Sequence, residues 1–138
     1  MEKIKVFVDW CGKNYAAYII DHRIHATSIV VTAKTREELE QKIQEALQFH
    51  IEECVADGDQ MPKWAAEGAY TLDVEPRMSA LLHEVQSYIT LAALSRATGI
   101  KHAQLSHYAN AVSEPKPLQR QRIVAGIHKI GQACIAFA

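Results

Sequence analysis

The chain has 138 residues, a length that allows one ordinary domain or two small ones. Hydrophobic residues make up 49% of it and charged residues 22%, so the composition excludes an intrinsically disordered protein. The formal net charge is −1, no apolar run approaches the roughly 18 residues of a membrane span, and the first residues lack the apolar core of a signal peptide, so we expect a cytoplasmic protein that does not enter a membrane.

The first third of the chain predicts three strands. Residues 4, 6 and 8 are aliphatic and alternate with other types, the period-two pattern of a half-buried strand over residues 3–10. A Gly-Lys-Asn turn leads to a hairpin partner over residues 15–20, and a third strand is expected over residues 26–32. Four large aromatic side chains supply more apolar surface than one helix covers, so we expect one sheet face to be less protected and open to a partner or to self-association: Phe7, Trp10, Tyr15 and Tyr18.

A helix and a fourth strand follow. Thr35-Arg36-Glu37-Glu38 has the form of a capping box, and an apolar stripe then continues at helical spacing as far as Asp57-Gly58-Asp59. Residues 69–74 are short and β-prone, and a right-handed helical crossover would place this fourth strand parallel to the first. Pro76 is expected in the first turn of the next helix.

From Pro76 onward only helical periodicity remains, and four helices fit. The first contains residues 78–89; the second covers 91–98 behind Thr90 as N-cap; the third covers 102–110; and the fourth covers 117–137. The predicted fold class is therefore α+β. It consists of an N-terminal four-stranded mixed sheet with one helix, in the order βββαβ, and a C-terminal all-α part.

The charge of the chain is divided unevenly. Residues 1–76 carry 8 Lys and Arg against 14 Asp and Glu, a charge of −6, whereas residues 77–138 carry 7 against 2, a charge of +5. Phosphate contacts need clustered Lys and Arg, so the pattern indicates a polyanion-binding module joined to an acidic one, with chance as the alternative. We predict two domains, residues 1–75 and 76–138.

Residues 91–110 predict a helix, a tight turn at Gly99 and a second helix. Leu94, Ile100, Leu105 and Tyr108 occupy the positions where two crossing helices must bury apolar groups. The sequence Leu-Ala-Ala-Leu-Ser-Arg-Ala-Thr-Gly-Ile, followed by Gln-Leu-Ser-His-Tyr, resembles the phage-repressor (Cro/Xre-like) helix-turn-helix family over about residues 77–134. This resemblance implies a DNA-binding domain.

By that resemblance the helix beginning at His102 is the recognition helix, whose N-terminal side chains enter the major groove. It implies that His102, Ser106 and His107 face base edges and that Ala103 offers apolar contact, for example to a thymine methyl. The other contacts are expected near phosphates, where they position the protein without specifying a sequence: Arg96, Lys101, Gln104 and Asn110, with Arg120 and Arg122 as outlying basic contacts. The alternative is a structural helical hairpin with solvated polar residues.

Other residue types that could carry chemistry give weaker patterns. The three cysteines are widely spaced without a C-x-x-C motif and are expected as reduced thiols. His22 and His25, in a strand or loop, are not spaced to place both imidazoles on one face. Asp9 and Asp73 are expected to end neighbouring strands, where two carboxylates could hold Mg²⁺ for phosphodiester cleavage. Further carboxylates would be needed, so we predict no catalytic residue, no metal site and no cofactor.

The order of the elements as a whole resembles that of HicB-type antitoxins: a three-strand meander, a Thr-capped helix, a short fourth strand and a repressor-type helix-turn-helix. Thr35, Glu37-Glu38-Leu39 and Glu45-Ala46-Leu47 fit the family helix. The resemblance implies a partial ribonuclease-H-like N-terminal domain, a C-terminal domain that binds operator DNA, and a partner that is a small basic mRNA-cleaving toxin of the HicA type.

Two functional hypotheses follow. The first is an antitoxin of a type II toxin–antitoxin pair, which holds the toxin with its acidic domain and autorepresses its operon. A homodimer or higher homo-oligomer is expected, because one helix-turn-helix reads only half of a palindromic site. The second hypothesis is a toxin-independent transcriptional regulator whose N-terminal domain senses a ligand or mediates oligomerisation.

Overall fold

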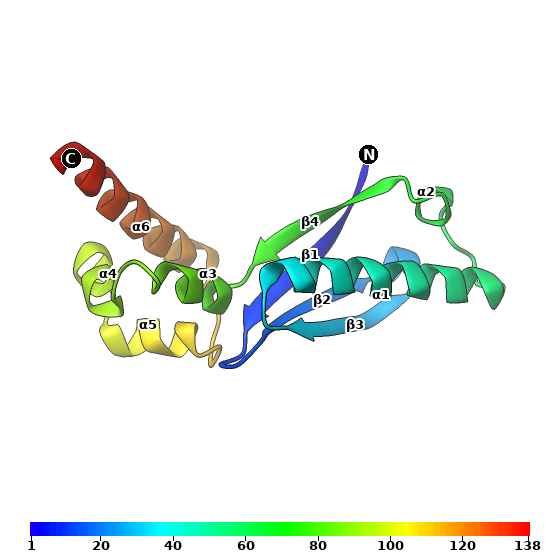
Figure 1. The fold of residues 1–138 in the computed structure, drawn as a ribbon, viewed down its shortest axis with the longest axis horizontal. Helices are drawn as coiled ribbons and strands as arrows, with labels where there is room; N and C mark the ends of the chain where they lie inside the picture. Colours follow the sequence, from blue (N-terminus) through cyan, green and yellow to red (C-terminus); the bar gives the residue numbers. More distant parts are fainter. The chain divides into compact units, whose positions relative to one another are not determined.

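The structure, a computed structural model, describes all residues from 1 to 138 (Figure 1). It is an α+β protein with a four-stranded mixed sheet and six α-helices, which confirms the predicted general class. The chain divides into two compact units, Met1–Pro76 and Arg77–Ala138. None of the helices combines the length and the apolar character needed to cross a bilayer.

The sheet lies entirely in the first unit. Its strands are β1 (Glu2–Trp10), β2 (Tyr15–Asp21), β3 (Ala26–Ala33) and β4 (Tyr70–Pro76), in the spatial order β3-β2-β1-β4. β1 is antiparallel to β2 and parallel to β4, and β2 is antiparallel to β3. Since β4 pairs with β1 alone, it forms one edge of the sheet.

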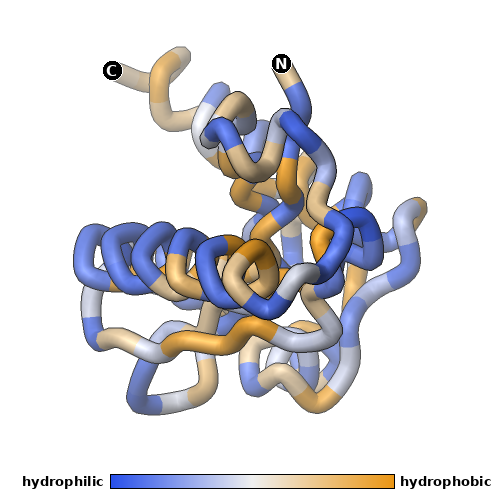
Figure 2. The backbone as a smooth tube through the Cα atoms, turned by 90° about the vertical axis from the view of Figure 1, so that its right-hand side faces the viewer, coloured by the Kyte–Doolittle hydropathy of each residue, from blue (hydrophilic) through white to orange (hydrophobic).

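Helix α1 (Arg36–Ala56) covers one face of this sheet. It begins where the sequence predicts, because the Thr35 hydroxyl accepts a hydrogen bond from the Glu38 amide at 3.2 Å. Its buried side chains recur at helical spacing: Leu39, Ile43, Leu47, Ile51 and Cys54. They pack over the inward residues of the strands, including Ile4, Val6, Ala17 and Ile19, each at most 1% exposed. In Figure 2, the turns of α1 show short hydrophobic stretches between hydrophilic ones, as expected for a helix with one buried face.

The four aromatic residues of the hairpin are divided between the two faces of the sheet. Tyr15 is buried on the helix side, and Trp10 pairs with it across the hairpin, with ring centroids 4.9 Å apart. Phe7 and Tyr18 stack at 5.3 Å on the opposite face, because side chains alternate along each strand. Ile20 and Val30, more than half exposed, extend this apolar area. The open face thus carries two of the four predicted aromatics.

Two short elements were not predicted. A single 3-10 turn, η1 (His22–Ile24), separates β2 from β3 and ends at His25, which has a positive φ of 57°. The imidazole Nε2 of His25 hydrogen-bonds the Gln60 carbonyl at 2.7 Å. The second element, helix α2 (Lys63–Ala66), lies between α1 and β4.

The second unit is all-helical, with α3 (Met78–Val85), α4 (Leu91–Thr98), α5 (His102–Ala109) and α6 (Pro117–Phe137). The prediction that Pro76 opens a helix is wrong. Pro76 ends β4 opposite Val8, and Arg77 is the N-cap of α3. Pairing with β1 continues the strand to this residue, and an edge strand tolerates a proline because one row of its amides has no strand partner.

Candidate nucleic-acid interface

Helices α4 and α5 are joined by a turn of three residues, Gly99, Ile100 and Lys101. Gly99 has a φ of 75°, and its amide donates to the Ser95 carbonyl at 2.8 Å. A side chain at this position would be held in the left-handed region that favours glycine. The chain therefore changes direction sharply at Gly99 between α4 and α5. Ile100, 5% exposed, inserts its side chain into the core.

Side chains close this turn from two sides. The Thr98 hydroxyl donates to the Leu94 carbonyl at 2.8 Å and accepts from the Ile100 amide at 3.1 Å. The Ser95 hydroxyl donates to the Ile100 carbonyl. From α6, the Arg122 guanidinium donates to the Thr98 carbonyl at 3.1 Å. The last turn of α4 is thus fixed by hydrogen bonds as well as by its apolar face.

A single apolar core holds α4 and α5 together. The predicted crossing residues Leu94, Ile100, Leu105 and Tyr108 are all buried in it. Helix α6 approaches α4 closely at Gly126, where a Cβ atom would lie 2.3 Å from Thr98 Cγ2. The full core comprises Met78, Leu82, Leu91, Leu94, Ile100, Leu105, Tyr108 and Ile123.

The outward face of α5 carries five of the predicted DNA-contacting residues. With 3.6 residues per turn, one side of the helix is lined by His102, Ala103, Ser106, His107 and Asn110. Of these, only Ser106 is half-buried; the other four are exposed, and the Asn110 amide is 3.4 Å from the Ser106 hydroxyl. The structure therefore brings these five residues together on one surface.

The remaining predicted residues do not share that face of α5. Lys101 is the exposed N-cap of α5, and no side chain caps the first amides of this helix. Gln104 is half-buried on a flank of α5, and Arg96 is exposed in the last turn of α4. Backbone N–H groups that are not capped at a helix N-terminus, next to a lysine, favour the binding of an anion.

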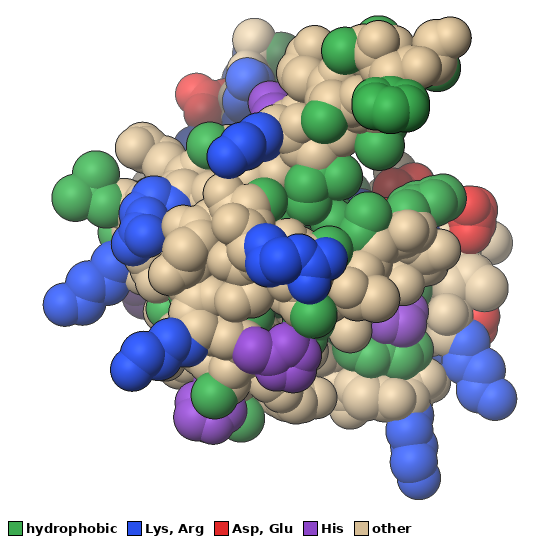
Figure 3. All heavy atoms as spheres, turned by 90° about the vertical axis from the view of Figure 1, so that its left-hand side faces the viewer, with side chains coloured by type: hydrophobic (Ala, Val, Ile, Leu, Met, Phe, Trp, Pro, Cys, Tyr) green, Lys and Arg blue, Asp and Glu red, His purple; other side chains and the backbone are tan.

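The acidic residues of the second unit are Glu84 and Glu114 alone, against seven Lys and Arg. Glu114 accepts from the Met78 amide at 3.0 Å and pairs with Arg77 at 3.3 Å and Arg120 at 3.9 Å. Arg120, expected as an outlying DNA contact, is thus held beside a carboxylate. The cations of this unit without an ion pair are Arg96, Lys101, Lys116, Arg122 and Lys129. In Figure 3, Lys, Arg and His side chains are spread over the face in view, and Asp and Glu side chains appear only toward its margins.

No protein-family model, curated protein or solved structure matches the chain.

The carboxylates considered for a nuclease do not meet. Lys5 lies opposite Asp73 in the parallel pair, and Val8 lies opposite Pro76, so Asp9 is four residues farther along the sheet than Asp73. At about 3.3 Å per residue the two strand positions are about 13 Å apart, whereas paired catalytic metals lie roughly 3.5–4 Å apart. Asp73 lies within its strand rather than at the end, and the prediction that both residues end neighbouring strands is wrong.

The cysteine nearest to a base is Cys54, whose Sγ lies 3.6 Å from Nε2 of His50. The same nitrogen is 2.8 Å from the Ile24 carbonyl, which can only accept, so Nε2 carries the proton and cannot take one from the thiol. Burial, and then the nearby Asp59 carboxylate, raise the pKa of Cys54. This pair favours a buried, protonated thiol rather than a nucleophile.

Proposed function

We propose that this protein is a sequence-specific DNA-binding repressor in which α4, the Gly99 turn and α5 form a helix-turn-helix. The observation that carries the proposal is the pairing of a tight left-handed turn with an exposed polar face on α5, with Lys101 at the start of that helix and Arg122 at the turn, neither of them paired with a carboxylate. Both features are needed for a helix to lie in the major groove: a fixed crossing of two helices and a surface that tolerates phosphates.

In this proposal α5 enters the major groove. His102, Ser106 and His107 offer hydrogen-bonding groups to base edges, and Ala103 offers a methyl for apolar contact. Lys101 and the first backbone amides of α5 contact phosphates of one DNA strand, and Arg96 of α4 also contacts the DNA backbone. Arg122 belongs with these contacts, because its hydrogen bond to the Thr98 carbonyl holds a positive charge at the turn.

The first unit is proposed to bind a basic protein. Its charge of −6 complements a small cationic partner, and its element order, with three antiparallel strands, a helix and a parallel fourth strand, is compatible with the partial ribonuclease-H-like domain of HicB-type antitoxins. The whole protein would then be the antitoxin of a type II pair. It would occlude a HicA-like mRNA interferase with one unit and repress the shared operon with the other.

Operator recognition requires at least two copies, because half-sites lie one helical turn, about 34 Å, apart. Apolar surface suited to self-association is available in the second unit. The end of α6 exposes Ile135 (72%) and Phe137 (97%), beyond the partly buried Ile127 and Ile130.

DNA binding is tested by electrophoretic mobility shift and by anisotropy across a salt series, with duplexes from upstream of the gene and a scrambled duplex as control. Arg96→Ala and Lys101→Ala should weaken binding to both duplexes and reduce the salt slope by about 1 each. His107→Ala should instead reduce the difference in binding free energy between the upstream duplex and the scrambled duplex by roughly 1–3 kcal/mol. Lys63→Ala, which removes an exposed lysine from the acidic unit, is the matched control and should change neither. Unchanged affinity in all three variants rejects α5 as the recognition helix.

The partner is tested by purifying the tagged full chain from its native host at low salt and identifying what accompanies it by mass spectrometry. A stoichiometric small basic protein that survives nuclease treatment supports the antitoxin. DNA without any protein favours the second candidate function, a toxin-independent regulator that uses its open sheet face, with Phe7 and Tyr18, for oligomerisation.

A further inference from the structure

A groove of about 540 Å³ runs between α1 and the edge strand β4. Its floor is apolar, formed by Ile43 and Leu47 of α1 and by Leu72 and Val74 of β4. A second groove of about 350 Å³ continues it past α2 and shares Tyr70 with it. Together they follow α1 from its first turns to Glu52.

The groove exists because one helix is too narrow for this sheet. A helix with its side chains is about 10 Å wide, and strands lie about 4.8 Å apart, so one helix covers about two strands. Helix α1 packs mainly on β3 and β2. The apolar side chains that β4 turns toward the helix layer, Leu72 and Val74, are consequently left half-buried, whereas Ile4 and Val6 beside them are buried.

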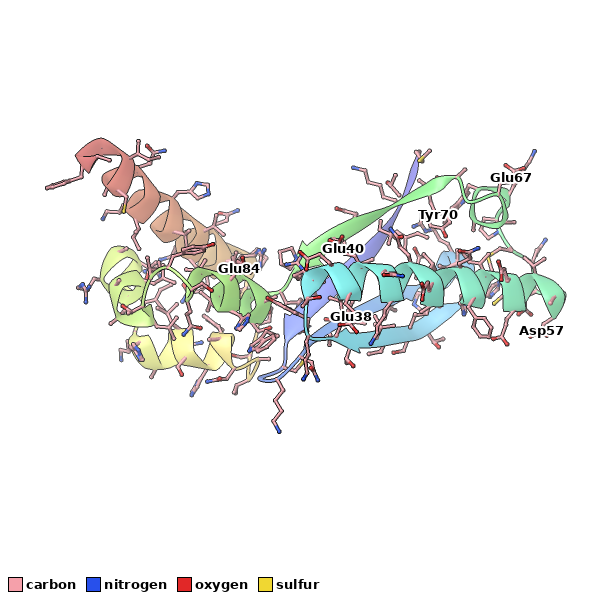
Figure 4. The ribbon with its side chains drawn as sticks, viewed as in Figure 1. Glu38, Glu40, Asp57, Glu67, Tyr70 and Glu84 are labelled. Atoms are coloured by element: carbon pink, nitrogen blue, oxygen red, sulfur yellow. The ribbon has the colours of Figure 1, made fainter.

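The groove is lined by three glutamates, Glu40, Glu52 and Glu67, and by no Lys or Arg. Lys63 of α2 pairs with Glu67 at 3.8 Å, so the unpaired negative charge on the rim comes from Glu40 and Glu52 of α1. The lysine of α1, Lys42, lies on the other flank of the helix, where it donates to the Thr32 carbonyl of β3 at 3.0 Å. Figure 4 shows Glu40, Tyr70 and Glu67 on the β4 side of α1.

We propose that this groove docks a basic amphipathic helix from a partner protein, which lies beside α1 and completes the helix layer over β4. The helix would set apolar residues against Leu72 and Val74 and turn Lys or Arg toward Glu40 and Glu52. These two glutamates are twelve residues apart, about 18 Å along α1, which matches a docked helix of about twelve residues. The inference rests on the proposed function in one respect, that the acidic unit binds a basic protein.

The probe for the test is a synthetic 14-residue helical peptide with Leu on one face and Lys on the other. The control peptide has the same composition in scrambled order, so that its Leu and Lys are not segregated. Binding to the full chain is measured by fluorescence anisotropy at 150 mM salt and mapped by backbone amide chemical shifts in the unmodified protein. The variant Glu40→Lys/Glu52→Lys reverses the groove charges. Its matched control, Glu45→Lys/Glu53→Lys, makes the same change in net charge on exposed residues of α1 that do not line the groove.

We expect the amphipathic peptide to bind at least tenfold more tightly than the scrambled one, and to shift amides of α1 and β4 around Leu47 and Leu72. The groove variant should lose at least tenfold in affinity and the control variant no more than twofold. Equal losses in both variants, shifts centred on Phe7 and Tyr18, or a peptide that pairs with β4 as an extended strand would each overturn the proposal. The chemical-shift map is measured on the unmodified protein, so it tests the location of the binding site even if a charge reversal impairs folding.

Failure of the groove is distinguishable from failure of the proposed function. If a copurified basic partner binds the groove variant as tightly as it binds the unmodified chain, the groove is wrong and the antitoxin proposal stands. If the three DNA-contact variants leave DNA affinity unchanged, the DNA-binding part of the proposed function fails, whatever the peptide does.

Discussion

The contact between α4 and α6 makes a specific prediction about two glycines of the same helix. Gly126 faces Thr98, and a Cβ atom there would lie 2.3 Å from Thr98 Cγ2, more than 1 Å inside ordinary carbon contact of about 3.5 Å. Gly131, five residues later in α6, has no atom within 4 Å of such a Cβ. The two Gly→Ala substitutions therefore differ mainly in packing, because both place alanine in a helix.

The magnitude follows from two opposing effects. Alanine in place of glycine in a helix stabilises it by up to about 1 kcal/mol, and this is the whole effect expected at Gly131. At Gly126 the added methyl must displace Thr98, whose hydroxyl is bonded to Leu94 and Ile100, and such overpacking costs about 1–3 kcal/mol. The unfolding free energies of the two variants should therefore differ by about 1–3 kcal/mol, with Gly126→Ala the less stable.

The assay is urea unfolding and thermal unfolding followed by circular dichroism. In a unit of this size 1 kcal/mol shifts the Tm by roughly 4–8 °C, so the predicted difference is measurable. Thr98→Ser removes Cγ2 and keeps the hydroxyl. In a chain that already carries Thr98→Ser, Gly126→Ala should therefore lower the unfolding free energy much less than it does in the unmodified chain. If Gly126→Ala is as stable as Gly131→Ala, or if Thr98→Ser gives no recovery, the close approach of α4 and α6 is refuted.

Three further predictions concern single side chains. Ala111 has a φ of 58°, so Ala111→Gly should raise the unfolding free energy by about 0.5–1 kcal/mol in denaturant titration. Glu114→Ala removes the acceptor of the Met78 amide and two ion pairs, and should lower it by about 1–3 kcal/mol; a loss below 0.5 kcal/mol would contradict this. Hydrogen bonds from Arg23 lower the pKa of Asp21 below 3.8, so this carboxylate stabilises the fold above pH about 4 and ceases to do so as the pH falls through the lowered value. Asp21→Asn should cost about 1–2 kcal/mol at pH 7 and progressively less as the pH falls through the lowered pKa of Asp21, whereas a pH-independent difference would reject the assignment.

Local signals in the sequence predicted much of the fold. The Thr35 and Thr90 hydroxyls mark the starts of α1 and α4 because they accept hydrogen bonds from amides three residues later, a contact that needs no tertiary partner. Pro117 lies in the first turn of α6, where its missing amide has no cost. The same rule failed at Pro76, because pairing with β1 decides that residue and is invisible in the adjacent sequence.

Features that depend on distant contacts were missed. Glu114 accepts from the Met78 amide 36 residues away, so it acts as a cap for α3 that no capping motif announces. The division of Phe7 and Tyr15 between opposite sheet faces could have been found from the sequence, since side chains alternate along a strand. The groove beside β4 could not, because it depends on which strands α1 covers.

The predicted site residues follow the same division. The helical period of α5 places His102, Ser106 and His107 on one face, and this period can be read from the sequence. The two arginines of α6 were predicted to be equivalent, yet they differ: Arg120 is 3.9 Å from Glu114, whereas Arg122 donates to the Thr98 carbonyl at the turn. This difference depends on how α6 crosses α4, which no local pattern encodes.

The position of Arg122 links the stability of the second unit to its proposed function. Its guanidinium hydrogen-bonds the carbonyl of Thr98, the residue that packs against Gly126 and orders the turn before α5. A phosphate that met this cation would therefore meet a charge whose position is already fixed by the fold, so less side-chain entropy would be lost on binding than for a freely rotating lysine. Lys101 makes no such bond. If α5 reads DNA, Arg122 thus fixes the turn and also supplies backbone affinity, whereas Lys101 supplies affinity alone.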